Sequence, residues 1–387
     1  MRHDVVRVAL LLAGSVASGW IGWSGHVLLL PAALAFPVLW SKAPNRATSA
    51  AVSAGYFLAA SRGLPQGVAN FYASDLWPGL LLWLFASLSF VAVHTALWSK
   101  HEKWRPIRYL AALVLMAIPP FGIAGWAHPI TAAGVLFPGW GWFGLLVTIA
   151  GAMALVTCIG PKVAIALGSF WLWSAATWIN PYAAKMWHGV DLQMHETLGR
   201  DAGLQRQHDL IAAVRTATGD DTRFVVLPES ALGFWTPTME RLWRRNLSGS
   251  DTVVIAGATV VDAEGYDNVL VAIDRDGGRI LYRERMPVPG SMWQPWRPWL
   301  GENGGARAYF FANPVAGIGP VRLTPVICYE QLIVWPILQS MLYNPDIIVA
   351  VGNGWWTAGT SIVAIQRASA TAWARLFSKP LVLSFNT

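Results

Sequence analysis

The sequence predicts two parts of different class: an α-helical multi-span membrane bundle over residues 1–182 and an α/β domain over residues 187–387. Of the 387 residues, 55% are hydrophobic and 13% are charged, and the mean hydropathy is +0.43, which is too apolar for an ordinary soluble enzyme. The acidic residues before position 190 are only Asp4, Asp75 and Glu102, so the composition changes abruptly there. Beyond that point, short apolar runs alternate with amphipathic stretches, as strands and helices do.

Seven apolar stretches in the first part are candidate membrane spans. They are Val5–Trp23, Val27–Trp40, Ala47–Ala60, Leu76–Trp98, Ile107–Gly125, Trp142–Ile159 and Val163–Ile179. A helix needs about 20 residues to cross the hydrocarbon core, and several stretches approach this length. The second and third are short, which suits tilted or re-entrant segments as well as full spans. We therefore expect about seven spans.

The placement of Lys and Arg predicts the orientation of these spans. The segments expected inside the cell contain Arg2, Arg7, Lys42, Arg46, Lys100, Lys103, Arg105, Arg108 and Lys162, whereas the outer loops contain only Arg62. Cytoplasmic loops are the ones enriched in Lys and Arg. An odd number of spans then makes the chain a multi-pass protein of the bacterial inner membrane with its α/β domain in the periplasm. One span more or fewer would invert this result.

Several function classes are disfavoured by what the chain lacks. No candidate span has a central Asp, Glu, Lys or Arg, as ion paths usually require, so a transporter is not expected. Cys158 lies in an apolar span and Cys328 in the other part, so they do not indicate a disulfide framework. Because no His and Cys residues are clustered with ligand spacing, we expect no metal site and no cofactor.

The second part contains the pattern of a layered α/β sandwich. The strand-like runs are Gly189–Met194, Phe224–Ser230, Val253–Ala258, Val269–Ile273, Ile280–Tyr282, Ala308–Phe311, Leu323–Glu330, Ile347–Val351 and Leu381–Phe385. Helices are expected over Ala202–Thr216, Pro237–Leu247, Leu332–Tyr343 and Ser361–Phe377. The run Asp274–Gly278 ends in two glycines, which favours a hairpin turn.

Two of the apolar runs end in residues with reactive side chains. One run ends in Glu229 and another in Cys328. A carboxylate close to a thiol can take its proton, and the thiolate can then attack an amide or ester carbonyl. A cysteine at the end of an apolar strand is also typical of a small buried hydrophobic residue. The pair alone leaves both interpretations open.

The motifs around these residues resemble those of the carbon–nitrogen hydrolase (nitrilase) superfamily. Leu227–Ala231 is similar to the motif with the general-base Glu, Val326–Glu330 to the nucleophile motif, and Val351–Trp356 to the strand-end motif that follows. Gln366–Ala368 and Arg375–Asn386 resemble the closing helix and strand. Behind a multi-span bundle, the resemblance is strongest to the membrane branch, the apolipoprotein N-acyltransferases. It implies a nitrilase-like αββα sandwich that works through a Cys thioester.

The chain departs from that pattern at the catalytic lysine. In the run Tyr282–Pro289, Glu284 stands where the family has Lys, and Arg285 or Arg283 is the cation that could replace it. Arg can stabilise an oxyanion but does not readily exchange a proton. A second family Glu is also missing, with Met292 or Trp293 near its place. These departures resemble nitrilase-like proteins of plasmid conjugal transfer.

The resemblance implies a set of site residues. The catalytic residues would be Glu229, Cys328 and Arg285, and the substrate-binding residues would be Tyr329, Glu330, Trp355 and Trp293. Glu330 is equally suited to start the following helix, and Tyr329 or Trp355 to pack in the core. The Trp293–Trp299 loop is expected to be a lid or a lipid-contacting surface, or else a packed cover.

Two hypotheses follow for the function. In the first, an amidase or N-acyltransferase of plasmid transfer acts on a lipoprotein or another acyl or amide substrate. In the second, a catalytically degenerate nitrilase fold is a scaffold of the mating apparatus. Membrane lipid and other conjugal transfer proteins are the expected partners. Direct binding of nucleic acid is not expected, because Arg241, Arg244 and Arg245 lie on one short helix that suits a solvated face.

Overall fold

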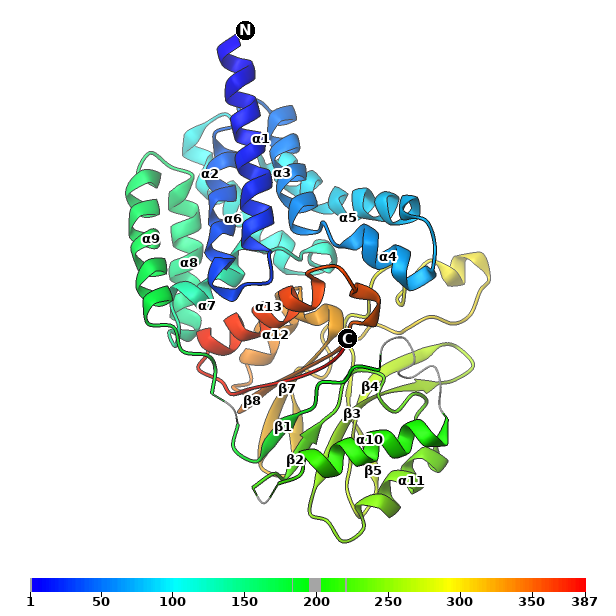
Figure 1. Ribbon diagram of the computed structural model, residues 1–387. Coiled ribbons are helices and arrows are strands. Elements are labelled where there is room, and N and C mark those ends of the chain that lie inside the picture. Colours follow the sequence, from blue (N-terminus) through cyan, green and yellow to red (C-terminus); the bar gives the residue numbers. More distant parts are fainter. Residues whose placement is uncertain (1, 183, 195–202, 220) are drawn as a thin grey trace. The chain divides into compact units, whose positions relative to one another are not determined.

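The computed structural model describes residues 2–182, 184–194, 203–219 and 221–387 (Figure 1). The chain divides into two compact units that do not follow each other simply along the sequence. The first unit runs to Pro181 and also includes Leu332–Trp335 and Gly359–Lys379. The second unit consists of Tyr182–Gln331, Pro336–Ala358 and Pro380–Thr387.

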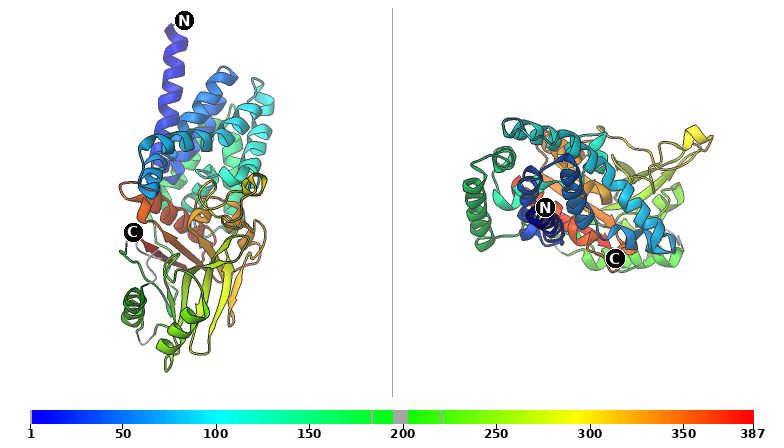
Figure 2. Two further views of the ribbon diagram at one scale, coloured as in Figure 1. Left: turned by 90° about the vertical axis from the view of Figure 1, so that its right-hand side faces the viewer. Right: turned by 90° about the horizontal axis from the view of Figure 1, so that it is seen from above.

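The described residues of the first unit are helical or lie in turns and loops. Its α-helices are α1 (Arg2–Gly22), α2 (Ala35–Ser41), α3 (Arg46–Ala60), α4 (Leu64–Tyr72), α5 (Leu76–Leu97), α6 (Arg105–Ala117), α7 (Ala133–Leu136), α8 (Gly141–Leu155), α9 (Gly160–Ala176) and α13 (Ile362–Leu376). Its 3-10 helices are η1 (Val27–Leu34), η2 (Glu102–Trp104), η3 (Phe121–Ala124) and η4 (Pro129–Ala132). Within this unit, the first turns of α1 extend beyond the neighbouring helices (Figure 2).

The structure does not confirm seven membrane-crossing helices. In the described part of the chain, two helices are long and apolar enough to cross a membrane: His3–Gly22 and Leu76–Leu97. The apolar stretch 27–40 is divided into η1 and α2, with Pro31 inside η1. Helix α6 ends at Ala117, shortly before Pro119. Proline lacks an amide hydrogen and disfavours helix in the preceding residue, so these stretches give shorter helices than expected.

Small residues bring helices α1 and α3 into close contact. A Cβ atom on Gly19 would lie 2.2 Å from the carbonyl oxygen of Tyr56, so no larger residue fits there. Beside this contact, the indole nitrogen of Trp23 donates to the Tyr56 hydroxyl at 2.9 Å, and that hydroxyl donates to the carbonyl of Ala127 at 2.8 Å. Close packing and paired polar groups are what helix association in a bilayer requires.

The second unit contains two β-sheets. The first has the order β1 (Trp187–Gly189), β2 (Phe224–Val226), β3 (Val253–Val261), β4 (Tyr266–Ile273) and β5 (Gly278–Arg283). The second has the order β6 (Ala316–Ile318), β7 (Val321–Ile327), β8 (Ile347–Asn353) and β9 (Leu381–Asn386). Strands β1 to β3 are parallel, as are β7 to β9, whereas β3 to β5 and the pair β6 and β7 are antiparallel.

A hydrophobic cluster joins the two sheets. It contains Ile255 and Leu270 from the first sheet and Leu323, Ile327 and Val349 from the second. Because alternate residues of a strand point to opposite faces, the first sheet also has residues for a second cluster on its other face. Helices α10 (Leu204–Ala217) and α11 (Pro237–Leu247) cover that face (Figure 1). The resulting layers, helices on a sheet on a second sheet, confirm the α/β part of the expected fold.

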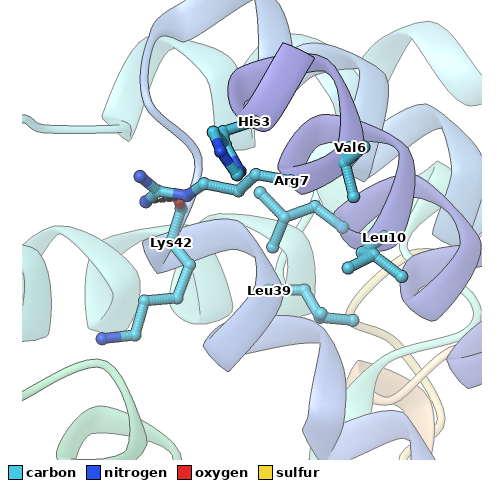
Figure 3. A pocket seen from close by; sticks show the side chains of 7 residues that line it. His3, Val6, Arg7, Leu10, Leu39 and Lys42 are labelled. Atoms are coloured by element: carbon cyan, nitrogen blue, oxygen red, sulfur yellow. Dashed lines mark hydrogen bonds between the residues drawn. The ribbon is translucent and has the colours of Figure 1, made fainter.

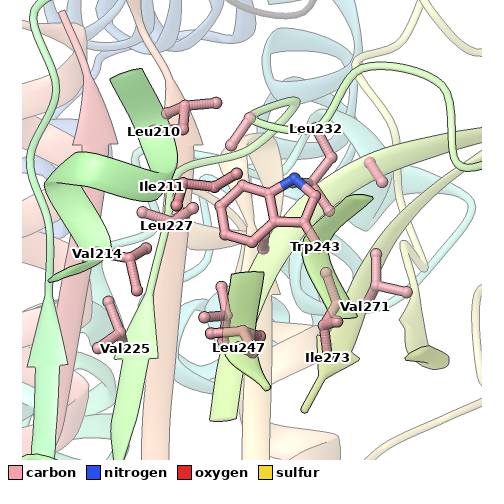
Figure 4. Close-up of a cluster of buried hydrophobic side chains, with 14 of the residues drawn as sticks. Leu210, Ile211, Val214, Val225, Leu227, Leu232, Trp243, Leu247, Val271 and Ile273 are labelled. Atoms are coloured by element: carbon pink, nitrogen blue, oxygen red, sulfur yellow. The ribbon is translucent and has the colours of Figure 1, made fainter. Parts of the chain in front are cut away.

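The cluster beneath α10 and α11 is centred on Trp243 (Figure 4). Its indole ring lies among Ile211, Leu232 and Val271 in the figure. The indole nitrogen donates to Gln207 at 2.9 Å, so the one polar atom of this buried side chain has a partner. Trp243 therefore packs α10 and α11 against the sheet whose strand β2 leads to Glu229.

Several element boundaries differ from those expected. No strand forms over 308–311; the strand before β7 is instead β6, which pairs with β7 as a hairpin. The first strand is Trp187–Gly189 rather than 189–194. The remaining elements of the unit are η6 (Arg297–Leu300), η7 (Cys328–Gln331), α12 (Trp335–Met341) and η8 (Trp355–Thr357). Residue 202, where a helix was expected to begin, is outside the described residues.

Candidate active site

Two sharp turns place Glu229 and Cys328 at the ends of strands. Strand β2 ends three residues before Glu229, and β7 ends immediately before Cys328. Cys328 has a φ of +43°, and Ser230, next to Glu229, has a φ of +61°. Residues other than glycine rarely adopt these values, and such strain persists only where the surrounding structure holds it. The fold therefore fixes the backbone from which both side chains project.

Gly257 allows strand β3 to pass close to the Glu229 turn. A Cβ atom at this position would lie 2.5 Å from both the Glu229 Cα and the Ser230 nitrogen. Its amide donates to the carbonyl of Pro228 at 3.1 Å. The backbone of β3 thus packs directly against the Glu229 turn, and glycine is the residue type that fits there.

The Glu229 carboxylate is held by three donors. It accepts hydrogen bonds from the Asn268 side-chain amide at 2.8 Å, from the Asn353 backbone nitrogen at 3.0 Å, and from the Cys328 thiol. The residues Glu229 and Cys328 are each only 5% exposed. Burial raises the pKa of Glu229, whereas the three hydrogen bonds favour its ionised form. The sequence-predicted base and nucleophile are therefore in direct contact.

A second carboxyl, that of Glu284, lies next to this pair. Glu284 directly follows β5, is 1% exposed, and accepts a hydrogen bond from the Asn268 side-chain amide at 2.9 Å through Oε2. Its Oε1 is buried and has no hydrogen-bond partner. Burial, and then repulsion by Glu229 and Glu330, raise the pKa of Glu284 well above its ordinary value. One asparagine thus bridges two buried carboxyl groups.

Glu330 supports the backbone on both sides of the site. Its carboxylate accepts hydrogen bonds from the Ile327 nitrogen at 2.8 Å, the Arg285 nitrogen at 2.7 Å and the Tyr282 hydroxyl at 2.7 Å. Ile327 directly precedes Cys328, so Glu330 fixes the end of the strand that leads to Cys328. Glu330 lies in η7, before α12, and its carboxylate is engaged with these donors rather than with the start of that helix.

The side chain of Arg285 is part of the same network. It is fully buried, and its Nε donates to the Tyr282 hydroxyl at 2.9 Å while lying 3.8 Å from the Glu330 carboxylate. Its Nη1 donates to the Pro336 carbonyl at 2.9 Å and to the Gln339 side chain at 3.1 Å. These contacts do not match the expected role of Arg285 as a replacement for the lysine, because its donors are already committed to groups other than Glu229 and Cys328.

Arg283 does not provide the replacement either. Its guanidinium forms an ion pair with Asp267, on strand β4, and is partly exposed. Asp267 also pairs with Arg307 at 2.7 Å. Both arginines of the run that resembles the lysine segment therefore serve ion pairs within the fold.

The expected substrate-binding aromatics lie in different surroundings. Tyr329 is partly buried between Cys328 and Glu330, and burial raises the pKa of its hydroxyl. Trp355 is partly buried and begins η8, two residues after Asn353. Trp293 packs edge-on against Phe310, with ring centroids 5.5 Å apart. Tyr329 and Trp355 therefore lie within two residues of Cys328 and Asn353, which contact Glu229, whereas Trp293 belongs to a separate aromatic loop.

The Trp293–Trp299 loop has exposed side chains at its tip. Trp296 and Leu300 are exposed, and Trp299 is 85% exposed. Arg297 holds the loop by donating to the Gln294 side chain at 3.0 Å. The exposure of Trp299 argues against the interpretation of this loop as a fully packed cover.

Sequence reasoning missed the contribution of Asn268. Asn268 is 2% exposed and is the third residue of β4, directly before the apolar run that begins at Val269. A buried amide needs partners, so a lone Asn before an apolar strand run was a usable signal. Asn353, in contrast, lies in the strand-end motif that was recognised. Its side chain accepts a hydrogen bond from Asn386 at 2.8 Å.

Outside this site, the structure contains a shallow surface hollow of 440 Å³ on the first unit (Figure 3). Residues of α1 and α2, together with Lys42, line it, and Arg7 donates to the Lys42 carbonyl at 2.9 Å. Its lining combines the cations Arg7 and Lys42 with His3 and apolar side chains. Within the described ranges, no group of three or more His, Cys, Asp or Glu residues is arranged to hold a metal ion.

The class of protein follows from these observations and a family comparison. A buried Glu and Cys in contact at strand ends, in a unit of two facing sheets, are the features that the sequence motifs predicted. The sequence profile described as carbon-nitrogen hydrolase matches residues 58–375. The chain therefore belongs to the carbon–nitrogen hydrolase family.

The particular relatives are conjugal transfer proteins. The chain is 67% identical over 387 residues to "Probable conjugal transfer protein TraB" of Sinorhizobium fredii, and the alignment covers 100% of both chains. It is 60% identical over 398 residues to "Conjugal transfer protein TraB" of Agrobacterium fabrum, covering 100% of this chain and 94% of the relative. The resemblance to nitrilase-like proteins of plasmid transfer is thereby confirmed.

Solved structures resemble the chain more distantly. An amidase of the nitrilase superfamily from Nesterenkonia matches 54% of this chain and 79% of its own, with 13% identity and a TM-score of 0.35.

Proposed function

We propose that this chain is a membrane-anchored component of conjugal plasmid transfer whose α/β unit transfers an acyl group through a thioester on Cys328. The observation that carries the proposal is the hydrogen bond from the Cys328 thiol to the buried Glu229 carboxylate. A carboxylate in contact with a thiol is placed to remove its proton. The names of the relatives support the assignment to conjugal transfer.

Acylation would follow directly from this contact. Glu229 takes the thiol proton, and the Cys328 sulfur forms a bond to the acyl carbon of an amide or ester. The tetrahedral intermediate then expels the amine or alcohol, which leaves with the proton held by Glu229. The donors Asn268 and Asn353 keep the Glu229 carboxylate in place through both proton transfers.

The second half of the reaction would release the acyl group. An amine or a water molecule gives its proton to Glu229 and attacks the thioester, and Cys328 regains its thiol. The low exposure of Glu229 and Cys328 supports transfer chemistry, because a site with little access to water protects a thioester from hydrolysis. An N-acyltransferase that acts on a lipoprotein is one member of this class, and an amidase is the other.

One observation favours the alternative of an inactive scaffold. The position of the family lysine is occupied by Glu284, and Arg285 and Arg283 are engaged elsewhere. Among the described residues of the run 282–289, neither arginine is therefore placed to stabilise an oxyanion, and such stabilisation is usually a large contribution to acyl transfer. The retained contact of Glu229 with Cys328 opposes this alternative, since a scaffold has no need of a base beside a thiol.

Trapping the thioester distinguishes the two functions. The detergent-solubilised full chain, with Cys158→Ser to remove the exposed second thiol, is treated with 4-nitrophenyl acetate and analysed by intact-mass spectrometry. We expect one acetyl adduct that hydroxylamine removes, and none when Cys328→Ser is added. Plasmid transfer frequency should fall in the Cys328→Ser strain and not in the Cys158→Ser strain.

The scaffold function makes the opposite prediction. The Cys158→Ser protein would then acquire no hydroxylamine-sensitive acetyl group, and the Cys328→Ser strain would transfer its plasmid at the normal frequency. This combined result would overturn the acyl-transfer proposal.

The first unit supports the membrane anchor. Helix α5 is apolar over 22 residues with a mean hydropathy of 2.0, yet only 22% of its apolar window is buried, and Phe85 is 72% exposed. Such a helix is stable in lipid rather than in water. At the N-terminal end of α1, exposed Val6 and Leu10 adjoin Arg7 and Lys42 (Figure 3), a combination that suits the boundary between acyl chains and phosphate groups.

We further propose that the second unit is periplasmic, and thiol labelling tests this topology. In a background with Cys158→Ser and Cys328→Ser, Asp276→Cys places one thiol in the exposed turn between β4 and β5. Lys103→Cys places one in an exposed turn of the first unit. In cells with a permeabilised outer membrane, an impermeant maleimide should label Asp276→Cys, and should label Lys103→Cys only after lysis. The reverse pattern would place the unit in the cytoplasm.

A further inference from the structure

Two side chains that are linked to Glu229 through the Asn268 amide each have a buried polar atom without a hydrogen-bond partner. These atoms are Oε1 of Glu284 and Oδ1 of Asn268. Glu284 and Asn268 are 1% and 2% exposed, so water does not satisfy these atoms from the surface. An unpaired buried polar atom destabilises a fold, and its persistence calls for a reason, of which a catalytic role is one. The Asn268 amide donates both to Glu284 and to the Glu229 carboxylate that contacts Cys328.

The two carboxyls of the site are not equivalent. Glu229 accepts from Asn268, the Asn353 nitrogen and the Cys328 thiol, all of which stabilise a negative charge. Glu284 accepts from Asn268 alone through its side chain. Because one amide group donates to both, the carboxyls are too close to be ionised together without strong repulsion. Glu229 has more donors to stabilise a negative charge, so Glu229 is the ionised carboxylate. The one proton that the two carboxyls share is then bound to Glu284.

We propose that Glu284 acts as a neutral carboxylic acid whose Oε1 hydroxyl donates a hydrogen bond to the acyl oxygen while Cys328 attacks. This inference rests on the proposed acyl transfer and supplies a donor to the oxyanion, a role for which Arg285 and Arg283 are not placed because they are engaged elsewhere. The donor then differs in charge from the one expected from the family pattern, because an uncharged carboxylic acid takes the place of a positively charged lysine. An acid held neutral in a buried site can fill this role in other enzymes.

Each proton is accounted for when Cys328 attacks the acyl carbon. Glu229 removes the thiol proton, sulfur bonds to the acyl carbon, and the carbonyl becomes an oxyanion. Glu284 shares its hydroxyl proton with that oxygen and retains it when the intermediate collapses. Glu229 alone passes a proton to the departing amine or alcohol. The bridging Asn268 is a positioning residue, since it holds both carboxyls and touches neither sulfur nor acyl oxygen in this scheme.

The charged and titratable groups facing Glu284 explain its protonation. Glu229 and Glu330 repel its charge, while Arg285 is paired with Glu330 and Cys328 with Glu229. Burial is the largest effect, and it raises the pKa of Glu284 well above its ordinary value of 4.5. The donor is therefore present while Glu284 is protonated and is lost when the pH rises above the raised pKa.

The pH profile of Cys328 acetylation tests this donor. The rate is measured with 4-nitrophenyl acetate in the full-length Cys158→Ser protein, with Cys328→Ser as the blank. Glu284→Leu should slow acetylation by about 10²-fold to 10³-fold, because a donor to the oxyanion is lost. Glu284→Gln keeps a donor and should lose less than about 10-fold. It should also abolish the fall in rate at alkaline pH. Glu264→Gln, at an exposed position of the same unit, should leave rate and profile unchanged.

The possible outcomes separate this inference from the proposed function. Acetylation of Cys328 that Glu284→Leu does not slow, or an alkaline limb that Glu284→Gln retains, overturns the role of Glu284 and leaves the acyl transfer standing. Absence of acetylation in the Cys158→Ser protein overturns both.

Thermal stability supplies a readout independent of activity. A buried carboxyl with a raised pKa binds its proton more tightly in the folded chain, so its stabilising effect is full below 4.5 and is lost as pH rises toward the folded-state pKa. Glu284→Gln mimics the neutral acid and removes this loss. The variant should therefore unfold at a higher temperature than its parent at pH 8, and the difference should disappear at pH 4. An equal or lower unfolding temperature at pH 8 would contradict a neutral Glu284.

Discussion

Replacing Glu229 by Gln should slow acetylation of Cys328 by about 10²-fold to 10⁴-fold, the usual contribution of a general base. The amide cannot take the thiol proton, and the buried site disfavours a thiolate that forms without a base. The measurement is the rate of hydroxylamine-sensitive acetylation in the full-length Cys158→Ser protein. Plasmid transfer by the same variant should fall in parallel.

A loss of rate must be separated from a loss of fold. Glutamine offers one acceptor oxygen where Glu229 offers two, so its amide hydrogens would face either Asn268 or the Asn353 nitrogen. This mismatch costs about 1–3 kcal/mol of stability. Glu229→Asp retains a carboxylate on a shorter side chain and should acetylate faster than Glu229→Gln. If Glu229→Gln reacted as fast as its parent, Glu229 would not be the base.

The positions of the candidate nucleophile and base at strand ends could be predicted from the sequence because both follow apolar runs. Cys328 and Glu229 end such runs, and strand ends are positions that a sheet fixes well. Local periodicity was sufficient for these elements, because the residues that form them are close together along the chain.

The roles of Glu284, Arg285 and Glu330 could not be predicted in the same way. Alternation along the strand shows that neighbouring residues point to opposite sides, but not which side contains Cys328. Arg285 donates to groups about 50 positions away, at Pro336 and Gln339, and such long-range contacts leave no periodic signal. The family pattern suggested a cation near the thiol, whereas Asn268 brings a second carboxyl there instead.

Replacing Arg285 by Met should destabilise the second unit by about 3–5 kcal/mol, the usual effect of removing one partner from a buried ion pair. The change leaves the Glu330 carboxylate without its positive partner and removes donors from Pro336, Gln339 and the Tyr282 hydroxyl. Because Cys328 is buried and is the one thiol in the Cys158→Ser protein, its reaction with a fluorogenic maleimide during heating reports unfolding.

The matched control is Arg275→Met in the same unit. Arg275 pairs with Asp251 at 2.9 Å, but both side chains are largely exposed, so this loss should be at most about 1 kcal/mol. If Arg285 were instead the oxyanion partner of Cys328, Arg285→Met would slow acetylation strongly at temperatures where the protein remains folded. We expect the contrary: a lower unfolding temperature, with an acetylation rate in the folded protein much closer to the parent than that of Glu284→Leu. The two variants together therefore show which residue of the run 282–289 has taken the place of the lysine, and which one holds the fold.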